Sequence, residues 1–402
     1  MELLLPDSPL IKAKKIAVVR LDGLGDSILA LPALRLLQKA CPWAEITVIA
    51  SQIGAPVFQD TFETAVFNLK ETGFTAKLAE FLKGRSYDVI FSFTEKGQAL
   101  EAIRLSGVNC RCGFFPGISQ PLKSLSLLRQ LNHRVYFNNT PGRSNKLHET
   151  ERFCLLLAEL GMKIPPVSEL PDLTFKLSQP ELESGQKVFK DTVNLKTAGH
   201  ASIAKEGAPA VAPSPKAFCA IQLMPRWHSN LPTVIKSQTT LPALGTDSPL
   251  HNRRFSFFWP LLHPVVELYI KLLGQQIQPI FTFAPPDQEW VKLFLQDFST
   301  AFPYNPPAPH FSTQDLRLFC AFLKNCAFMV TPDGGAAHLA AAASLPVIAI
   351  FPAKNVKANV SRWKPWRVPC QVVVRDQEKQ DKQNEAEEFV KDLYEASLKT
   401  CP

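Results

Sequence analysis

Two short stretches of the chain place glycines and an acidic residue directly after an apolar run. The first is DGLGDS at residues 22–27, which follows the run KIAVVRL. Two glycines let the backbone turn tightly and approach a ligand, and the N–H groups that open a following helix can bind an anion. The stretch is therefore a candidate anion- and acceptor-binding loop. Its candidate residues are Gly23, Gly25 and Ser27.

Asp26 stands in this loop at the expected start of the helix. A carboxylate there is either the N-cap of the helix or a general base, and the residue pattern alone favours the cap. A dinucleotide-binding loop of the type G-x-G-x-x-G is disfavoured. Ile28 stands where the third glycine belongs, and no acidic residue closes the next apolar run, EITVIASQ.

The second stretch is TPDGGAAH at residues 331–338, before an alanine-rich segment. Its small residues leave room for a diphosphate at a helix N-terminus. His338 would lie one turn into the helix, and a single histidine on such a helix is more often packed than ligand-binding. The candidate donor-binding residues are Thr331, Asp333, Gly334, Gly335 and His338.

Together the two stretches offer a carboxylate and an anion-binding turn. Group transfer from a nucleotide sugar needs both. A base deprotonates the acceptor hydroxyl, and a helix N-terminus stabilises the departing diphosphate.

Alternating strand and helix patterns must position these loops, and they predict two α/β units with parallel sheets. In the first unit we expect strands at 15–21, 45–50 and 87–93 and helices at about 27–40, 75–83 and 147–161. In the second we expect strands at 218–224, 279–284, 327–332 and 346–351 and helices at about 261–274, 313–325, 335–343 and 384–398. Pro32 predicts a kink in the first helix or a later start of its regular part.

The composition is that of a globular protein and excludes disordered, collagen-like and coiled-coil chains, with 46% hydrophobic and 20% charged residues. A net charge of +8 favours an anionic partner, and no nucleic-acid-binding motif is present. The sequence lacks an apolar run long enough to span a membrane and a secretory signal pattern, so we expect a cytoplasmic protein. Nine scattered cysteines agree with that, and Cys110 and Cys112 have no second pair with which to bind zinc.

Longer segments around both loops resemble glycosyltransferase family 9, the lipopolysaccharide heptosyltransferases. KIAVVRLDGLGDSILALPALRLLQKACPWAEITVIAS is similar to the family's strand followed by R/K-x-x-x-x-GD-x-x-x-x-x-PAL and P-x-A-x-I. VTPDGGAAHLAAAASLPVIAIF is similar to D-[TS]-G-x-x-H-L-A-A-A-x-x-x-P-x-[IV]-x-[IL]-[FY], and LHETERFCLLLAELGM is similar to the helix that ends the family's first domain. The three blocks occur in the family's order.

The resemblance implies a GT-B fold, with two Rossmann-like α/β/α domains that face each other across a cleft. It implies an inverting, metal-independent transfer of heptose from ADP-heptose to the Kdo/heptose inner core of lipopolysaccharide. Asp26 matches the catalytic base, which reverses the preference for a cap. Asp333, Gly335 and His338 match the donor-binding loop. No cofactor is expected besides the nucleotide sugar, and we expect a monomer in peripheral contact with the inner face of the inner membrane.

The same resemblance suggests the domain boundaries. We expect an acceptor-side domain with the catalytic base over residues 1–180, a linker or insertion over 181–216 and a nucleotide-sugar-binding domain over 217–402. Residues 194–216 are rich in Ala, Pro, Gly and Lys without apolar periodicity, which is typical of a linker. The last helix is expected to return to the first domain, as in other GT-B chains.

Three features depart from the family or stay open. Phe257 stands where the family has a lysine on the donor phosphates, and Gly334 replaces a Thr or Ser. The cations that could replace the lysine are Arg226, Lys236, Arg253 and Arg254. This leaves two alternatives: a member that uses another nucleotide sugar, and a degenerate homologue that binds a nucleotide or glycan without catalysis. RWKPWR at 362–367 is either an acceptor or membrane contact or a packed aromatic corner, and the residues favour the corner.

Overall fold

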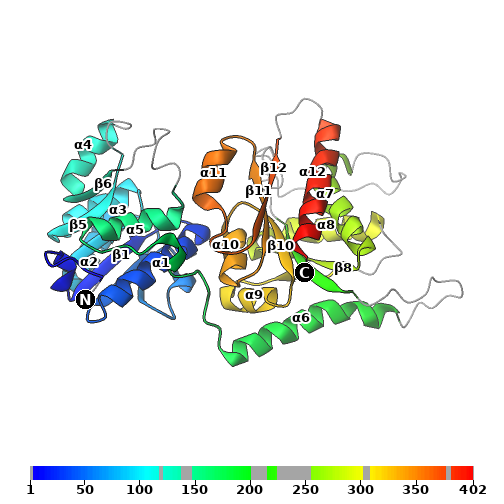
Figure 1. Cartoon of the computed structure of the whole chain (residues 1–402), viewed down its shortest axis with the longest axis horizontal. Coiled ribbons are helices and arrows are strands. Elements are labelled where there is room, and N and C mark those ends of the chain that lie inside the picture. Colours follow the sequence, from blue (N-terminus) through cyan, green and yellow to red (C-terminus); the bar gives the residue numbers. More distant parts are fainter. Residues whose placement is uncertain are drawn as a thin grey trace, which may run out of the picture. The chain divides into compact units, whose positions relative to one another are not determined.

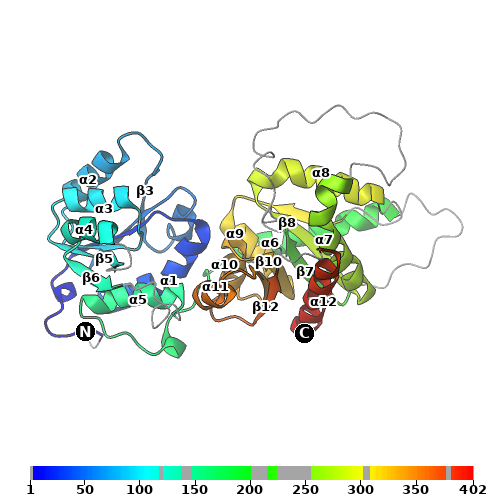
Figure 2. The ribbon, with the colours of Figure 1, turned by 90° about the horizontal axis from the view of Figure 1, so that it is seen from above.

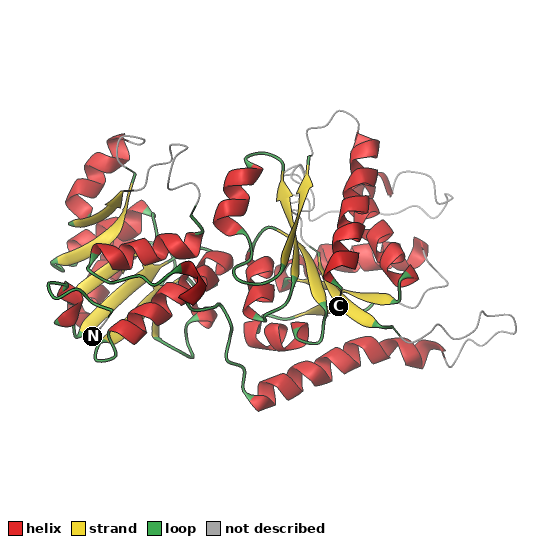
Figure 3. Ribbon diagram, viewed as in Figure 1, coloured by secondary structure: helices red, strands yellow, loops and turns green. Residues whose placement is uncertain are grey.

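The chain forms two compact α/β units in the computed structural model, which describes residues 3–116, 121–136, 147–200, 215–223, 255–301, 308–376 and 382–401 (Figure 1). Unit 1 comprises Met1–Leu173 and Lys357–Arg367, and unit 2 comprises Thr174–Val356 and Val368–Pro402. In each unit, helices flank a parallel sheet (Figure 3). None of the helices in these ranges is long and apolar enough to cross a membrane.

Unit 1 has a six-stranded parallel sheet in the order β3-β2-β1-β4-β5-β6. Its strands are β1 (Lys15–Arg20), β2 (Glu45–Ala50), β3 (Glu63–Val66), β4 (Val89–Ser92), β5 (Cys110–Phe115) and β6 (His133–Tyr136). Its helices are α1 (Leu24–Ala40), α2 (Phe74–Arg85), α3 (Gly97–Leu105), α4 (Pro121–Gln130), α5 (Glu149–Glu159) and α11 (Val356–Trp363), which begins one residue before the unit 1 segment. The strand order reverses between β1 and β4, and ligands of such sheets bind beyond the carboxyl ends of the strands at that point.

Unit 2 repeats this topology with the order β12-β11-β10-β7-β8-β9, again all parallel. Its strands are β7 (Ala217–Gln222), β8 (Ile277–Phe283), β9 (His310–Ser312), β10 (Phe328–Pro332), β11 (Val347–Pro352) and β12 (Cys370–Arg375). Its helices are α6 (Gln179–His200), α7 (Phe255–Gly274), α8 (Gln288–Ala301), α9 (Leu316–Leu323), α10 (Gly335–Ala342) and α12 (Lys382–Thr400). Its reversal lies between β7 and β10 (Figure 2).

The central strands are apolar because helices cover both faces of each sheet. Ile16, Ala17, Val18 and Val19 of β1 are all fully buried, without the alternation of a half-exposed strand. Helix α1 follows β1 after a short turn, is buried over most of its length from Ser27 to Ala40, and packs against α5. The helix begins at Leu24, before Pro32, and continues past it. Its regular part therefore starts before the proline.

Two parts of the expected organisation differ in the structure. Residues 181–200 of the expected linker lie in the long helix α6, which packs against α9 of unit 2. Residues 201–214 lie outside the described residues. The last helix, α12, packs on α7, β11 and β12 of its own unit. The segment that returns to unit 1 is Lys357–Arg367 instead.

Candidate functional site

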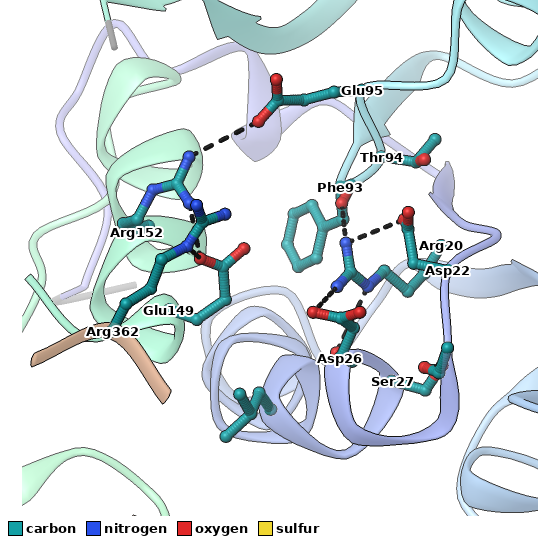
Figure 4. Close-up of polar contacts among 12 residues, drawn as sticks. Arg20, Asp22, Asp26, Ser27, Phe93, Thr94, Glu95, Glu149, Arg152 and Arg362 are labelled. Atoms are coloured by element: carbon teal, nitrogen blue, oxygen red, sulfur yellow. Dashed lines mark hydrogen bonds and ion pairs between the residues drawn. The ribbon is translucent and has the colours of Figure 1, made fainter. Parts of the chain in front are cut away.

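Asp26 lies just beyond the carboxyl end of β1 in the first turn of α1, and Arg20 holds it there (Figure 4). An Nη2–Oδ1 distance of 3.1 Å joins the guanidinium to the Asp26 carboxylate. Nε of Arg20 also donates to the backbone carbonyl of Asp26, at 3.2 Å. The loop between strand and helix is thereby fixed at both its ends by one side chain.

The carboxylate of Asp26 has one engaged and one open oxygen. Oδ1 meets Arg20, whereas Oδ2 accepts no hydrogen bond from any described residue. Gly23 is the N-cap of α1, so the cap interpretation of Asp26 is wrong. The Asp26 side chain is 38% exposed. A half-buried carboxylate with a free oxygen at a strand end can accept a proton from a bound hydroxyl.

The Arg20 side chain is buried, with 4% of it exposed, and each nitrogen of its guanidinium group has a polar partner. Nη1 donates to Oδ2 of Asp22 at 3.0 Å and also to the carbonyl oxygen of Phe93 at the end of β4. The guanidinium lies 4.8 Å from the centre of the Phe153 ring, a cation–π contact. Strands β1 and β4 and helix α5 thus all contribute to holding this cation.

A second charge cluster lies beside the first. Glu149 opens α5, is 3% exposed, and its Oε2 accepts from Nη1 of Arg152 at 2.5 Å and from Nε of Arg362 at 2.6 Å. Arg152 also approaches Oε1 of Glu95, with an Nη2–Oε1 distance of 3.6 Å, as Figure 4 shows. The returning helix α11 therefore supplies Arg362 to the neighbourhood of Asp26.

Burial and the neighbouring charges together move the pKa values of Asp26 and Glu149 in opposite directions. Burial raises the pKa of Asp26 above its ordinary value, against the opposing effect of Arg20. The negative charges of Asp22 and Glu149 raise it further, and Arg362 lowers it. Burial also raises the pKa of Glu149, but Arg152 and Arg362 outweigh it and hold that pKa below its usual range. The surroundings therefore favour proton uptake at Asp26 and the ionised form at Glu149.

The loop residues singled out from the sequence are brought together around Asp26. Gly23 is exposed, and a Cβ there would lie 3.8 Å from Oδ2 of Asp26. Gly25 lies in the first turn of α1. Ser27 is fully buried, and its hydroxyl donates to the carbonyl oxygen of Gly23 at 3.0 Å. Ser27 consequently shapes the loop from inside.

The second candidate stretch lies at the carboxyl end of β10 in unit 2, next to the reversal of strand order. Thr331 is buried and donates to the carbonyl oxygen of Pro332 at 3.0 Å. The backbone N–H of Asp333 donates to the carbonyl oxygen of Ile350 in β11 at 2.9 Å, which ties the turn to the next strand. Asp333 itself is half-buried.

Gly334 is the N-cap of α10 and has φ 153° and ψ −166°, a conformation open almost only to glycine. Gly335 opens the helix and is half-buried. His338 is 2% exposed, in agreement with the packed alternative. The turn thus presents the first N–H groups of α10 beyond the strand end.

The remaining sequence candidates are placed as follows. Arg226, Lys236, Arg253 and Arg254 lie outside the described residues, and of Phe257 the structure describes only its place in α7. Trp366 is 7% exposed and packs against the tilted ring of His148, with ring centres 4.5 Å apart, which confirms the packed corner at this residue. Within the described ranges, Cys110 and Cys112 belong to no cluster of side chains that could hold a metal ion.

Sequence reasoning missed the charge network around Asp26. Arg20 occupies the R/K position of the family pattern R/K-x-x-x-x-GD, but the sequence placed it only inside the expected strand 15–21 and gave it no role. Glu149 and Arg152 lie in the predicted helix 147–161, more than 120 residues further along the chain. Their buried ion pair was not distinguishable from a surface pair one helical turn apart.

The match to a family model supports the resemblance found in the sequence. Residues 308–392, which include β10, the turn and α10, match the model of glycosyltransferase family 9 (heptosyltransferase). Among curated proteins, none matches this sequence.

Solved structures with the same fold cover nearly the whole chain. E. coli ADP-heptose lps heptosyltransferase II matches 95% of this chain and 99% of its own, with a TM-score of 0.59 and 17% identity. A glycosyl transferase family 9 protein from Veillonella parvula matches 90% and 86%, with a TM-score of 0.56 and 14% identity. E. coli heptosyltransferase WaaC with ADP matches 94% and 99%, with a TM-score of 0.53 and 15% identity.

These findings confirm two expectations from the sequence. The resemblance to family 9 is confirmed by the match over residues 308–392. The fold of two Rossmann-like units is confirmed by the two six-stranded parallel sheets and by their likeness to the heptosyltransferase structures. Together they support a glycosyltransferase.

Proposed function

We propose that this chain, which carries a family 9 segment within a heptosyltransferase-like fold, is an inverting glycosyltransferase with Asp26 as its general base. The observation that carries the proposal is the state of the Asp26 carboxylate. It lies at the reversal point of the unit 1 sheet, Arg20 holds one oxygen, and the other is open among the described residues. A general base for an acceptor hydroxyl needs this combination of fixed orientation and free oxygen.

The proposed reaction is a single displacement. The acceptor hydroxyl donates a hydrogen bond to Oδ2 of Asp26, and its proton passes to that oxygen as the hydroxyl oxygen attacks the anomeric carbon. The bond between that carbon and the diphosphate oxygen breaks, and attack from the opposite face inverts the configuration. The raised pKa of Asp26 favours proton uptake by this carboxylate.

The turn at residues 331–338 is the proposed donor-binding element. Its supporting features are the Gly334 backbone conformation and the N–H groups that open α10, which favour the negative charge of a diphosphate. Asp333 is proposed to contact hydroxyls of the donor sugar. The buried His338 is proposed to support the turn from within α10.

For the substrates we propose ADP-heptose as the donor and the Kdo/heptose inner core of lipopolysaccharide as the acceptor. The family match supports this choice, as do two structural neighbours, an ADP-heptose heptosyltransferase and a heptosyltransferase with ADP. The net charge of +8 suits a phosphorylated lipid acceptor at the inner face of the inner membrane. We propose that the protein works there as a peripheral, monomeric enzyme without a cofactor or metal.

Two alternatives follow from Phe257, which replaces the family's lysine on the donor phosphates. In the first, the enzyme uses another nucleotide sugar with the same base. In the second, the chain binds a nucleotide or glycan without transferring the sugar.

Ligand-induced thermal stabilisation identifies the donor and tests the proposed donor site, and a sugar-transfer assay then separates an enzyme from a chain that only binds. The full chain is heated with ADP-heptose, ADP, UDP-sugars, CMP-Kdo or NAD, each near 100 times its dissociation constant, where binding adds about 2.7 kcal/mol. Stabilisation by ADP-heptose and ADP alone is the expected result. Stabilisation by a different nucleotide sugar supports the first alternative. If no nucleotide stabilises the chain, the proposed donor site is wrong.

A further inference from the structure

The Arg20 guanidinium stands between two carboxylates rather than one. Nη1 donates to Oδ2 of Asp22 at 3.0 Å, and Nη2 lies 3.1 Å from Oδ1 of Asp26. Lys96, 3.7 Å from the other oxygen of Asp22, adds a second cation on that side. The two aspartates therefore share one buried arginine, and any change at one alters the charge seen by the other.

The position of this arginine is set by groups that do not titrate in the ordinary pH range. The carbonyl oxygen of Phe93 at the end of β4 accepts from Nη1, and the backbone carbonyl of Asp26 accepts from Nε. The Phe153 ring covers the guanidinium and is itself stacked on Phe93, with ring centres 4.7 Å apart. Arg20 would keep its place whatever the protonation state of Asp26.

This geometry directs the Asp26 carboxylate. Arg20 approaches the carboxylate at Oδ1, and Oδ2 lies on the side of the exposed Gly23. We propose that Arg20 is the positioning residue of the reaction, holding Asp26 by one carboxylate oxygen so that the other oxygen meets the acceptor. Asp22 pairs with the same guanidinium and thereby weakens the attraction between Arg20 and Asp26. This inference rests on the proposed function, because it assigns how the base of that reaction is held.

Charge changes on the two sides of Arg20 should have opposite effects on Asp26. The charged groups that act on Asp26 are Arg20 of β1, Asp22 of the loop, Glu149 of α5 and Arg362 of α11. Removing the cation in Arg20→Gln should raise the Asp26 pKa by about one unit or more. Removing the competing anion in Asp22→Asn should lower it. General damage to the loop would not reverse sign between the two variants.

The direct test is an NMR titration of the full chain with ¹³C-labelled aspartate carboxyls, in which Asp26→Asn identifies the Asp26 signal. We expect an upward shift of the Asp26 titration midpoint in Arg20→Gln and a downward shift in Asp22→Asn. In Arg20→Lys the midpoint should return part of the way to the wild-type value, because lysine restores the positive charge without the planar guanidinium group. Arg35→Gln is the matched control. Arg35 lies on α1 and pairs with Asp172 at 3.2 Å, away from the loop, so it should leave the midpoint unchanged.

The kinetic test separates positioning from binding. In Arg20→Gln we expect the turnover number to fall tenfold to hundredfold with little change in the Michaelis constant for the acceptor, and the acidic limb of the pH–rate profile to move upward. Equal Asp26 midpoints in wild type, Arg20→Gln and Asp22→Asn would overturn the inference. Opposite shifts without sugar transfer in the wild type would keep the arrangement around Arg20 but overturn the proposed function. Should Arg20→Gln not fold, the Asp22→Asn midpoint alone decides.

Discussion

At Gly334 a single residue controls the shape of the proposed donor turn. Its φ of 153° is strained for any residue with a Cβ, at a cost of about 1–3 kcal/mol. Gly334→Ala should therefore lower the stability of unit 2 by about that amount and weaken nucleotide binding, because the first N–H groups of α10 would turn away. Thermal unfolding with and without nucleotide measures both effects.

The control for Gly334→Ala is Gly97→Ala. Gly97 opens α3 in unit 1, and no atom lies within 4 Å of a Cβ placed there. Alanine at that position should leave stability unchanged or raise it slightly. If Gly334→Ala behaves like Gly97→Ala, the turn does not depend on the glycine conformation.

Asp26 could be selected from the sequence, because a carboxylate between a buried strand and a helix is a recognisable pattern. Its role could not be decided there. Whether it caps the helix or stays open to a ligand depends on which atoms face it, and the residues that raise or lower its pKa include Glu149 and Arg362. These partners are distant in the sequence and meet only in the folded unit.

Helix α6 shows how one close contact fixes an element. Gly185 faces α9 so closely that a Cβ there would lie 2.4 Å from the Cβ of Ala321 and 2.6 Å from its carbonyl carbon. Arg317 of α9 pairs with Glu181, and the Phe189 ring lies 5.4 Å from that of Phe322. The two helices therefore touch along α6, with the glycine at the closest point.

Gly185→Ala should force these helices apart and destabilise unit 2 by about 1–3 kcal/mol. The matched control is Gly84→Ala on α2, where a Cβ meets nothing within 4 Å and the helix gains a better helix former. Urea unfolding of both variants measures the difference. Equal stability of the two would mean that α6 is not packed as closely as the structure has it.

Most of the central strands were predictable, whereas the central strand β5 and the edge strands were not. Helices cover β1, β2, β4, β7, β8, β10 and β11 on both faces, so each reads as an apolar run. The four edge strands β3, β6, β9 and β12 have exposed positions, and none was expected. Helix α6 was mistaken for a linker because its sequence is polar and contains a glycine in its first half.

At the scale of the whole chain, unit 1 is completed by a segment from the far end of the sequence. Lys357–Arg367 lies between β11 and β12, two neighbouring strands of unit 2, yet it belongs to unit 1. Nε2 of His148 lies 2.8 Å from the carbonyl oxygen of Lys364. Arg367 donates to the carbonyl oxygens of Leu170 and Ser168. The sequence predicted the wrong returning element, because α12 buries Phe389, Val390 and Leu393 in unit 2.

The contact between His148 and the segment Lys357–Arg367 should make the stability of unit 1 sensitive to acid. Burial lowers the pKa of His148 to about 4 from an ordinary 6.5, despite the opposing effects of the Lys364 carbonyl and Glu149. The folded state therefore excludes a proton that the unfolded state binds. The contribution to stability is complete above pH 6.5 and is lost as the pH falls to 4, by about 3 kcal/mol in total.

The variant His148→Gln tests this. Its amide can still accept from the Thr150 N–H at the start of α5 and donate to the Lys364 carbonyl, but it does not titrate. Urea unfolding between pH 7 and pH 4 should show a shallower loss of stability in the variant than in the wild type. If the stability of the variant and of the wild type falls in parallel with pH, His148 is not kept neutral by its burial in unit 1.

The central claim is that Asp26 removes the proton from the acceptor hydroxyl. The most direct test compares sugar transfer from ADP-heptose to a Kdo-bearing lipid acceptor by the wild type and by Asp26→Asn. Asparagine keeps an oxygen for Arg20 but cannot take up the proton. We predict that nucleotide binding and the melting temperature persist in Asp26→Asn while the turnover number falls at least hundredfold. Turnover in Asp26→Asn equal to that of the wild type would contradict the account.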